Sequence, residues 1–353
     1  MVAARVRDEM RAVGLDVEVV DVAPGRPNVV GVLDASASGH TLLLCGHLDT
    51  VGVAGMAAPF TPVERNGRVF GRGSQDMKGG IAAMIGAAAV IAARGLRGGR
   101  LIVATVADEE YASLGADALV STWRADGAVV AEPTDLAVAI GHKGFSWLEV
   151  DTIGHAAHGS RPAEGRDAIL DMGRVLGRLA AIDTELRVRA PHPLLGTASL
   201  HASMITGGRE LSVYPDHCRL ALERRTLVDE PDGIALTEVE EVLRVLSADD
   251  GALQASARVL FERPAYEIAP DHPLPQALAR ILTGARLPSA FVGMSFWTDA
   301  AVLARANMPS VLFGPTGGGL HGRDEYVTVD SVLTCRDVLA NLADNYCPEP
   351  KAN

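Results

Sequence analysis

Short apolar runs alternate with longer ones along the first 130 residues, and this alternation constrains the fold more than any other feature. TLLLC (41–45), LIVATVA (101–107) and AVVA (128–131) have the length and composition of buried strands. The uncharged run from Ile81 to Ala93 is longer, which indicates a buried helix, and it is too short to span a bilayer. Strands that alternate with helices predict an α/β fold with a mostly parallel sheet and helices on both faces.

The sequence pattern changes at about Phe145 and changes back after Tyr266. Between these points, alternating apolar and polar residues predict four strands, and residues 167–181 and 234–246 predict two amphipathic helices. The order strand-helix-strand-strand-helix-strand is that of a ferredoxin-like α+β unit with a small antiparallel sheet. We therefore predict a larger domain formed by residues 1–145 and 265–353, interrupted by a smaller domain formed by residues 146–264.

Composition narrows the range of partners and compartments. The chain has 32 Lys and Arg against 44 Asp and Glu, and the resulting net charge of −12 argues against nucleic acid and anionic membranes as partners. The N-terminal residues alternate charged and apolar side chains, unlike a signal peptide. The four cysteines show no CxxC spacing, which favours free thiols and a cytoplasmic location.

Acidic residues and histidines gather at the ends of the predicted buried strands and in a glycine-rich loop: His47, Asp49, Asp76, Asp108, Glu109, Glu110, Glu132 and His321. Each has an ordinary structural explanation when taken alone, and Asp76 in particular is typical of a helix N-cap. Together they lie where open α/β folds build their sites. Clustered carboxylates raise one another's pKa values unless cations lie among them. Two divalent metals sharing one carboxylate, at a separation of about 3.5–4 Å, would supply that charge.

Six ordered motifs make the sequence recognisable: GHLDTV, GRGSQDMKGG, ADEEYASLGA, AEPT, GHAAHGSRP and GGGLHG. In order and spacing they resemble the M20 metallopeptidases, and specifically the branch of acetylornithine deacetylases and succinyl-diaminopimelate desuccinylases. The resemblance implies that the larger domain is a zinc-exopeptidase-like catalytic domain. It also implies that the inserted domain serves as a lid and in dimerisation.

The resemblance assigns a role to each residue of the strand-end cluster. It implies two zinc ions per chain, with cobalt or manganese as alternatives, because mixed histidine and carboxylate ligands suit these metals. The residues alone do not decide whether Glu109 or Glu110 is the base; the resemblance implies Glu109. The implied metal ligands are His47 and Glu132 on one metal, Glu110 and His321 on the other, and Asp76 between them, with Asp49 orienting His47.

The resemblance also extends to residues that would contact the substrate. His158 matches a histidine that reaches the active site of the partner subunit in related homodimers and stabilises the oxyanion. Arg224 matches an arginine that binds the substrate carboxylate, although a lone strand arginine is by default an exposed residue. Ser212 stands where many relatives carry asparagine, and Gly318 is expected at the substrate as well.

The expected protein is a homodimeric enzyme that removes an acyl group from the amino group of an amino acid. Its substrate would be a small N-acyl amino acid or a short peptide. A dipeptidase or carboxypeptidase of the same family would use the same metals with a different pocket. A metal-stabilised binding protein without catalysis would lack the base, whereas Glu109 is present, and a serine hydrolase would need a GxSxG motif, which is absent.

Overall fold

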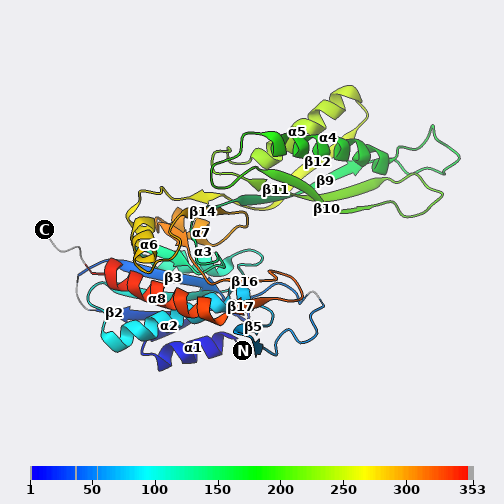
Figure 1. Cartoon of the computed structure of the whole chain (residues 1–353). Helices are drawn as coiled ribbons and strands as arrows, with labels where there is room; N and C mark the ends of the chain where they lie inside the picture. Colours follow the sequence, from blue (N-terminus) through cyan, green and yellow to red (C-terminus); the bar gives the residue numbers. More distant parts are fainter. Residues whose placement is uncertain (1, 36–37, 54, 349–353) are drawn as a thin grey trace. The chain divides into compact units, whose positions relative to one another are not determined.

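The computed structural model describes residues 2–35, 38–53 and 55–348, which form two compact units (Figure 1). Unit 1 comprises Met1–Gly141, Glu267–Met294 and Thr298–Asn353, and unit 2 comprises His142–Tyr266 and Ser295–Trp297. The return of Ser295–Trp297 to unit 2 was not expected from the sequence. Its cause is Trp297, whose indole N–H donates to the Pro264 carbonyl and whose ring meets the ring of Phe145 edge-on.

Unit 1 contains a nine-stranded sheet whose central strands are parallel, which confirms the predicted fold class. The apolar runs predicted as buried strands form its middle, where their side chains are almost completely inaccessible to solvent. The strands follow the order β1 (Asp16–Ala23), β2 (Arg26–Asp34), β6 (Arg100–Val106), β3 (Thr41–His47), β7 (Gly127–Val130), β15 (Ser310–Leu312), β8 (Val138–His142) and β13 (Tyr266–Glu267), with β14 (Phe291–Met294) beside β8.

Helices cover both faces of this sheet. Helices α2 and α8 pack together on one face, and α3 and α7 pack together on the other (Figure 1). The described helices of unit 1 are α1 (Val2–Ala12), α2 (Gly79–Arg94), α3 (Leu114–Thr122), α6 (Pro273–Gly284), α7 (Ala300–Arg305) and α8 (Val329–Tyr346).

The apolar helix that contains α2 passes a test of length and hydropathy for crossing a membrane, over Ser74–Arg94. However, 56% of the tested window is buried inside the protein. Ile81, Met84 and Ile91 are among its fully or almost fully buried side chains. Its apolar character is therefore accounted for by packing against α8 and the sheet.

A second, four-stranded sheet of unit 1 was not expected from the sequence. It has the order β16 (Gly317–Gly318), β17 (Tyr326–Thr328), β5 (Arg68–Phe70) and β4 (Val63–Arg65), all paired antiparallel. Strands of two or three residues are too short to give a periodic pattern. This small sheet brings the glycine-rich loop near residue 320 beside the segment that precedes α2.

Unit 2 has the predicted ferredoxin-like order of elements. Its antiparallel sheet has the order β10-β11-β9-β12, and helices α4 and α5 cover one face of it. The core between them contains Leu148, Val150, Met172 and Leu220. The elements are β9 (Gly144–Ile153), α4 (Ala168–Val188), β10 (Ser199–Gly207), β11 (His217–Thr226), α5 (Ile234–Asp249) and β12 (Gln254–Arg263).

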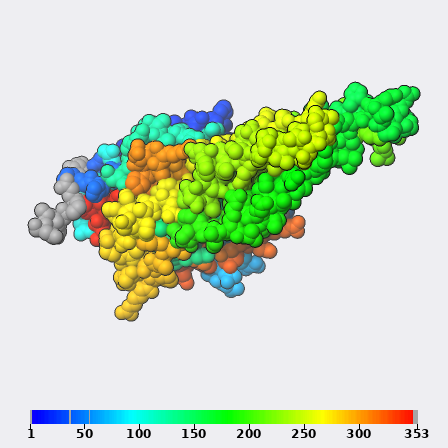
Figure 2. All heavy atoms as spheres, turned by 90° about the horizontal axis from the view of Figure 1, so that it is seen from above, coloured from blue at the N-terminus to red at the C-terminus, as the bar shows by residue number. Residues whose placement is uncertain are grey.

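Helix α4 begins at a side-chain cap, because the Asp167 carboxylate accepts from the backbone N–H groups of Ile169 and Leu170, each at 2.9 Å. Unit 2 by itself is elongated, and Figure 2 shows its residues in green to yellow. All four cysteines of the chain lie in the described part, and each is buried as a free thiol: Cys45, Cys218, Cys335 and Cys347.

Candidate metal centre

The register of the main sheet places His47 beside Glu132. Strands β3 and β7 are parallel, and Cys45 lies opposite Val130. His47 and Glu132 each follow two residues later, so their side chains leave the same face at the carboxyl ends of neighbouring strands. Both are buried, and His47 Nε2 lies 3.8 Å from Glu132 Oε1.

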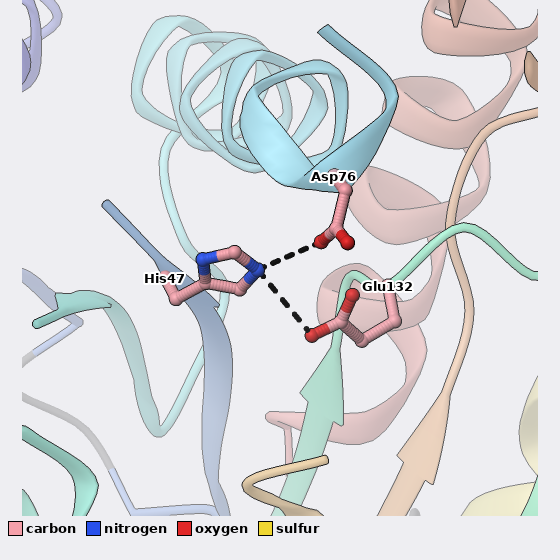
Figure 3. A group of neighbouring side chains, drawn as sticks. All are labelled: His47, Asp76 and Glu132. Atoms are coloured by element: carbon pink, nitrogen blue, oxygen red, sulfur yellow. Dashed lines mark hydrogen bonds and ion pairs between the residues drawn. The ribbon is translucent and has the colours of Figure 1, made fainter. Parts of the chain in front are cut away.

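Asp76 reaches this pair from a short helical turn, η1 (Ser74–Lys78), that precedes α2 (Figure 3). Its Oδ1 lies 2.8 Å from His47 Nε2, and its Oδ2 lies 3.1 Å from His321 Nε2. The N-cap of α2 is Lys78, without a side-chain cap hydrogen bond. Asp76 therefore does not cap the helix, and its carboxylate lies between two histidines.

A second group of potential ligands shares Asp76 with the first. The Nε2 atom of His321 lies 3.5 Å from Glu110 Oε2, while Glu110 Oε1 accepts from the backbone N–H of Val51 at 3.1 Å. In each group one donor atom per residue lies within 4.8 Å of the others. We call His47, Asp76 and Glu132 the first cluster, and Asp76, Glu110 and His321 the second cluster.

Asp49 connects His47 to the two consecutive glutamates. The Nδ1 atom of His47 lies 3.2 Å from the backbone oxygen of Asp49 and 3.6 Å from its Oδ1. The Asp49 carboxylate also accepts from the backbone N–H groups of Glu109 at 3.3 Å and Glu110 at 3.2 Å. Asp49 is thus placed to orient the ring of His47 through its second nitrogen, as carboxylates do for metal-binding histidines.

Burial raises the pKa values of three carboxyl groups at the site: Glu109, Glu110 and Glu132. The charge of Asp76 raises the pKa values of Glu110 and Glu132 further, and the charge of Glu132 does the same to Glu109. The nearby imidazole of His47 opposes the shift in all three. These carboxylates therefore repel one another in the absence of cations.

The neighbouring carboxylates raise the pKa values of His47 and His321, which favours the charged form of both rings. Burial alone lowers the pKa of His47, but its contacts with Asp49 and Asp76 raise that pKa well above the usual value. Burial likewise raises the pKa of Asp76, but its hydrogen bonds to His321 and His47 outweigh burial and hold that pKa far below the usual range. The two rings thus partly supply the positive charge that the carboxylates require.

The residues present fit divalent metal ions. Imidazole nitrogens and carboxylate oxygens without thiolates are a donor set that zinc, cobalt and manganese accept. Both clusters have three such donors, and Asp76 can offer one oxygen to each. Cations at these positions would relieve the mutual repulsion of the glutamates.

The remaining expected substrate contacts lie in different parts of the chain. In unit 2, His158 is exposed, its Nδ1 lies 2.8 Å from Ser160 Oγ, and its residue forms a β-bridge with Val213. Ser212 lies beside it, because its carbonyl accepts from the backbone N–H of Gly159 at 2.7 Å. Gly318 lies in β16 of unit 1, where a Cβ would approach the Tyr326 ring within 2.8 Å.

Arg224 does not lie where a substrate carboxylate could reach it. Its side chain is completely buried on the face of β11 that packs against the helices. The guanidinium is bound by Glu230 at 2.6 Å and by Glu238 at 2.9 Å, and it also donates to the Arg225 carbonyl. These internal partners correct the expectation that Arg224 is available to bind substrate.

The next residue of β11, Arg225, has a partly exposed guanidinium. It lies opposite Phe145 on the sheet face away from α4 and α5, with 30% of its side chain exposed. Its Nε donates to Glu223 at 2.5 Å, and its guanidinium lies 5.5 Å from the centre of the Phe145 ring. Strand alternation was the available signal, because neighbouring arginines in a strand must point to opposite faces.

Comparison with known proteins agrees with this geometry. Residues 43–345 match the family described as Peptidase family M20/M25/M40. The chain is 30% identical to acetylornithine deacetylase of Myxococcus xanthus over 93% of this chain and 86% of the relative. It is 27% identical to N-formyl-4-amino-5-aminomethyl-2-methylpyrimidine deformylase of Bacillus subtilis (strain 168), over 97% and 88% of the two chains.

A solved structure shares the fold at lower identity. A tripeptidase from Staphylococcus aureus superimposes with a TM-score of 0.81 and 20% identity, covering 97% of this chain and 91% of the other. The family match spans most of the chain, and the candidate metal centre lies within the matched residues. The chain therefore belongs to peptidase family M20/M25/M40 and is a metal-dependent hydrolase of amide bonds.

Proposed function

We propose that the protein is a dinuclear zinc amidohydrolase that removes a short acyl group from the amino group of an amino acid. The observation that carries this proposal is the pair of clusters that share Asp76, with Glu109 next to Glu110 in the chain. Two relatives support the reaction type, because a deacetylase and a deformylase both release an amine from an acyl group.

The metal ligands and Glu109 have different roles in amide hydrolysis. When bound, a metal pair lowers the pKa of water and polarises a carbonyl group. Glu109 accepts the proton of the attacking water and returns it to the leaving amine. Its burial favours this role, because burial raises its pKa toward neutral pH. A group that acts first as general base and then as general acid works best when its pKa is near the working pH.

We assign recognition of the substrate carboxylate to Arg225. Arg224 has its donors occupied by buried partners, whereas Arg225 is partly exposed beside an aromatic ring. A guanidinium can hold a carboxylate through two parallel hydrogen bonds. We keep Ser212 and Gly318 as proposed substrate contacts, the first through its hydroxyl and the second through a backbone that cannot accept a side chain.

We further propose a cytoplasmic homodimer that joins through unit 2. Strand β10 is an edge strand of its sheet, and residues His201–Gly207 of this strand are all exposed. Met204 and Ile205 are apolar residues among them, with 70% and 51% of their surface exposed. An open edge of this kind favours pairing with a second copy of the same edge. In the dimer, His158 stabilises the oxyanion at the metal centre of the other protomer.

A hydrolysis screen tests the proposed function. The metal-loaded protein is incubated with N-formyl, N-acetyl and N-succinyl amino acids and with dipeptides that carry the same C-terminal residue, and released amine is measured. Metal-loaded Glu109→Gln protein is the control for contaminating activity. We expect the highest kcat/KM on an acylated amino acid; highest kcat/KM on a dipeptide would make the protein a peptidase instead.

A further inference from the structure

A buried ion pair, Arg72 with Glu325, lies beside the second cluster and contacts the backbones of His321 and Asp76. Arg72 follows β5 by two residues, and Glu325 directly precedes β17, the strand that pairs with β5. Their side chains are 1% and 0% exposed, and Arg72 Nη1 donates to Glu325 Oε2 at 2.6 Å. A fully buried pair of charges is costly to desolvate, so it requires several additional hydrogen bonds.

Glu325 finds these bonds in the backbone that carries Asp76. Its Oε2 accepts from the N–H of Gly73 at 2.9 Å. Its Oε1 accepts from the N–H groups of Gln75 at 3.0 Å and Asp76 at 3.1 Å. The Glu325 carboxylate therefore binds the backbone of the turn η1 at three N–H groups. One of these belongs to Asp76, the ligand that the two clusters share, so Glu325 fixes the position of its backbone.

Arg72 holds the opposite side of the second cluster. Its Nη2 donates to the carbonyl oxygens of His321 at 3.3 Å and Gly322 at 2.9 Å. His321 has a φ of +58°, in the left-handed region that residues with a side chain seldom adopt. The two carbonyl contacts hold this unfavourable backbone conformation in place, and with it the direction of the imidazole.

The two clusters are thus positioned by different parts of the fold. His47 and Glu132 stand at the ends of adjacent parallel strands, where the register of the main sheet sets their spacing. His321 lies in a loop between the short strands β16 and β17. The ion pair connects His321 to Asp76, because Arg72 donates to the His321 carbonyl and Glu325 accepts from the Asp76 N–H.

We propose that the Arg72–Glu325 pair is a positioning device that sets the distance between Asp76 and His321, and that its loss weakens metal binding at the second cluster far more than at the first. This inference rests on the proposed dinuclear site. The pair touches neither metal nor substrate. It acts through the backbones of two ligands, so metal affinity rather than turnover is its direct readout.

The test replaces Arg72 by lysine, which keeps the charge but cannot bind Glu325 and two carbonyl oxygens in the same fork. Two controls match it. Arg100→Lys makes the same change at an exposed arginine that donates twice to Asp34. Leu278→Ala removes a fully buried side chain of α6 and lowers stability without touching the metal ligands. Glu325→Asp, which withdraws the carboxylate by one methylene, gives the same readout if Arg72→Lys does not accumulate as folded protein.

Zinc affinities of the metal-free proteins are measured by competition with a chromophoric chelator, together with their unfolding by denaturant. In the unaltered protein we expect two zinc-binding steps. In both control variants we expect the same two steps, each with the affinity of the unaltered protein. In Arg72→Lys we expect the first step within about threefold of normal and the second step weakened about 10- to 100-fold, the usual effect of losing a partner that orients a metal ligand.

Two results would overturn the inference while leaving the dinuclear site intact. One is an Arg72→Lys protein that binds two zinc ions as tightly as normal. The other is an equal weakening of both steps, matched by Leu278→Ala protein of the same stability, which would show that the pair only stabilises the fold. If the unaltered protein binds fewer than two ions, the proposed function itself fails and the inference fails with it.

Discussion

His47 and His321 lie on opposite sides of a single carboxylate, with their Nε2 atoms 2.8 Å from Asp76 Oδ1 and 3.1 Å from Asp76 Oδ2. The first histidine ends a strand of the main sheet and the second lies in a loop of the small sheet. Asp76 is therefore the point where two separately built ligand groups meet.

Replacing the two consecutive glutamates separates a base from a metal ligand. Glu109→Gln should keep both zinc ions and lower kcat by a factor on the order of 10² to 10⁴, the usual effect of removing a general base. Glu110→Gln should instead weaken zinc binding at the second cluster. Zinc content and kcat are measured for each variant. Near-normal turnover in Glu109→Gln would place the base elsewhere.

The neighbouring arginines of β11 should respond in opposite ways. Arg224→Met leaves Glu230 without its cation and Glu238 with only the more distant Arg189, and it should lower the free energy of unfolding by about 3–5 kcal/mol. Arg225→Lys should leave that free energy nearly unchanged and raise KM, because lysine lacks the two-pronged geometry for a carboxylate. Amidated substrates should show no such difference between Arg225→Lys and the unaltered enzyme. A raised KM only in the Arg224 variant would return the role to Arg224.

His142 should make the folded protein sensitive to mild acid. Its buried ring lies near Tyr266 and Trp297, and burial lowers its pKa from about 6.5 to about 4. Between these values the unfolded chain binds a proton that the folded protein excludes, so stability falls as the pH falls. The contribution is about 1.4 kcal/mol per pH unit within this window.

Unfolding by denaturant, followed by tryptophan fluorescence at pH 7, 5.5 and 4.5, measures this slope. His142→Gln cannot take up the proton, so its stability should fall less steeply with acid than that of the unaltered protein. The carboxylates of the metal centre titrate in both proteins and cancel in the comparison. Identical slopes would show that His142 is not kept neutral by burial.

Mixing two inactive variants tests the proposed sharing of His158 between protomers. A dimer of one His158→Ala chain and one Glu109→Gln chain contains one site with an intact Glu109 in its own chain and an intact His158 from the other. Up to half of the normal activity should return after subunit exchange, since losing one oxyanion donor costs roughly 10² to 10³ in rate. If His158 acts within its own chain, every mixed site lacks one group. Exchange verified by mass spectrometry without recovered activity would therefore contradict the shared site.

The sequence predicted the helices and strands that bury either one face or all of their side chains. The apolar runs of β3, β6 and α2 could be assigned because a buried strand and a buried helix differ in length. The strands β4, β5, β16 and β17 could not, because two or three residues give no periodic pattern and the β5–β17 pairing joins segments far apart in the sequence. The small sheet that supports His321 was missed for this reason.

Within the site, the residues alone indicated a carboxylate and histidine cluster but not the individual roles. Asp76 fitted an N-cap equally well, and only the fold shows its carboxylate between two histidines. The prediction for Arg224 did not consider the alternation of β11, which places the Arg224 side chain in the core and the Arg225 side chain on the opposite face. Arg72 and Glu325 could not be paired from sequence, because 253 positions separate them.

Anomalous X-ray diffraction from zinc-loaded crystals, recorded above and below the zinc absorption edge, shows whether two metal ions share Asp76. We expect two peaks per chain, one bounded by His47, Asp76 and Glu132 and the other by Asp76, Glu110 and His321. The peaks should lie about 3.5–4 Å apart, the usual spacing of two metals that share a carboxylate. Crystals that show no zinc peak at these residues, or a single peak with Asp76 turned away, would contradict the proposed dinuclear site.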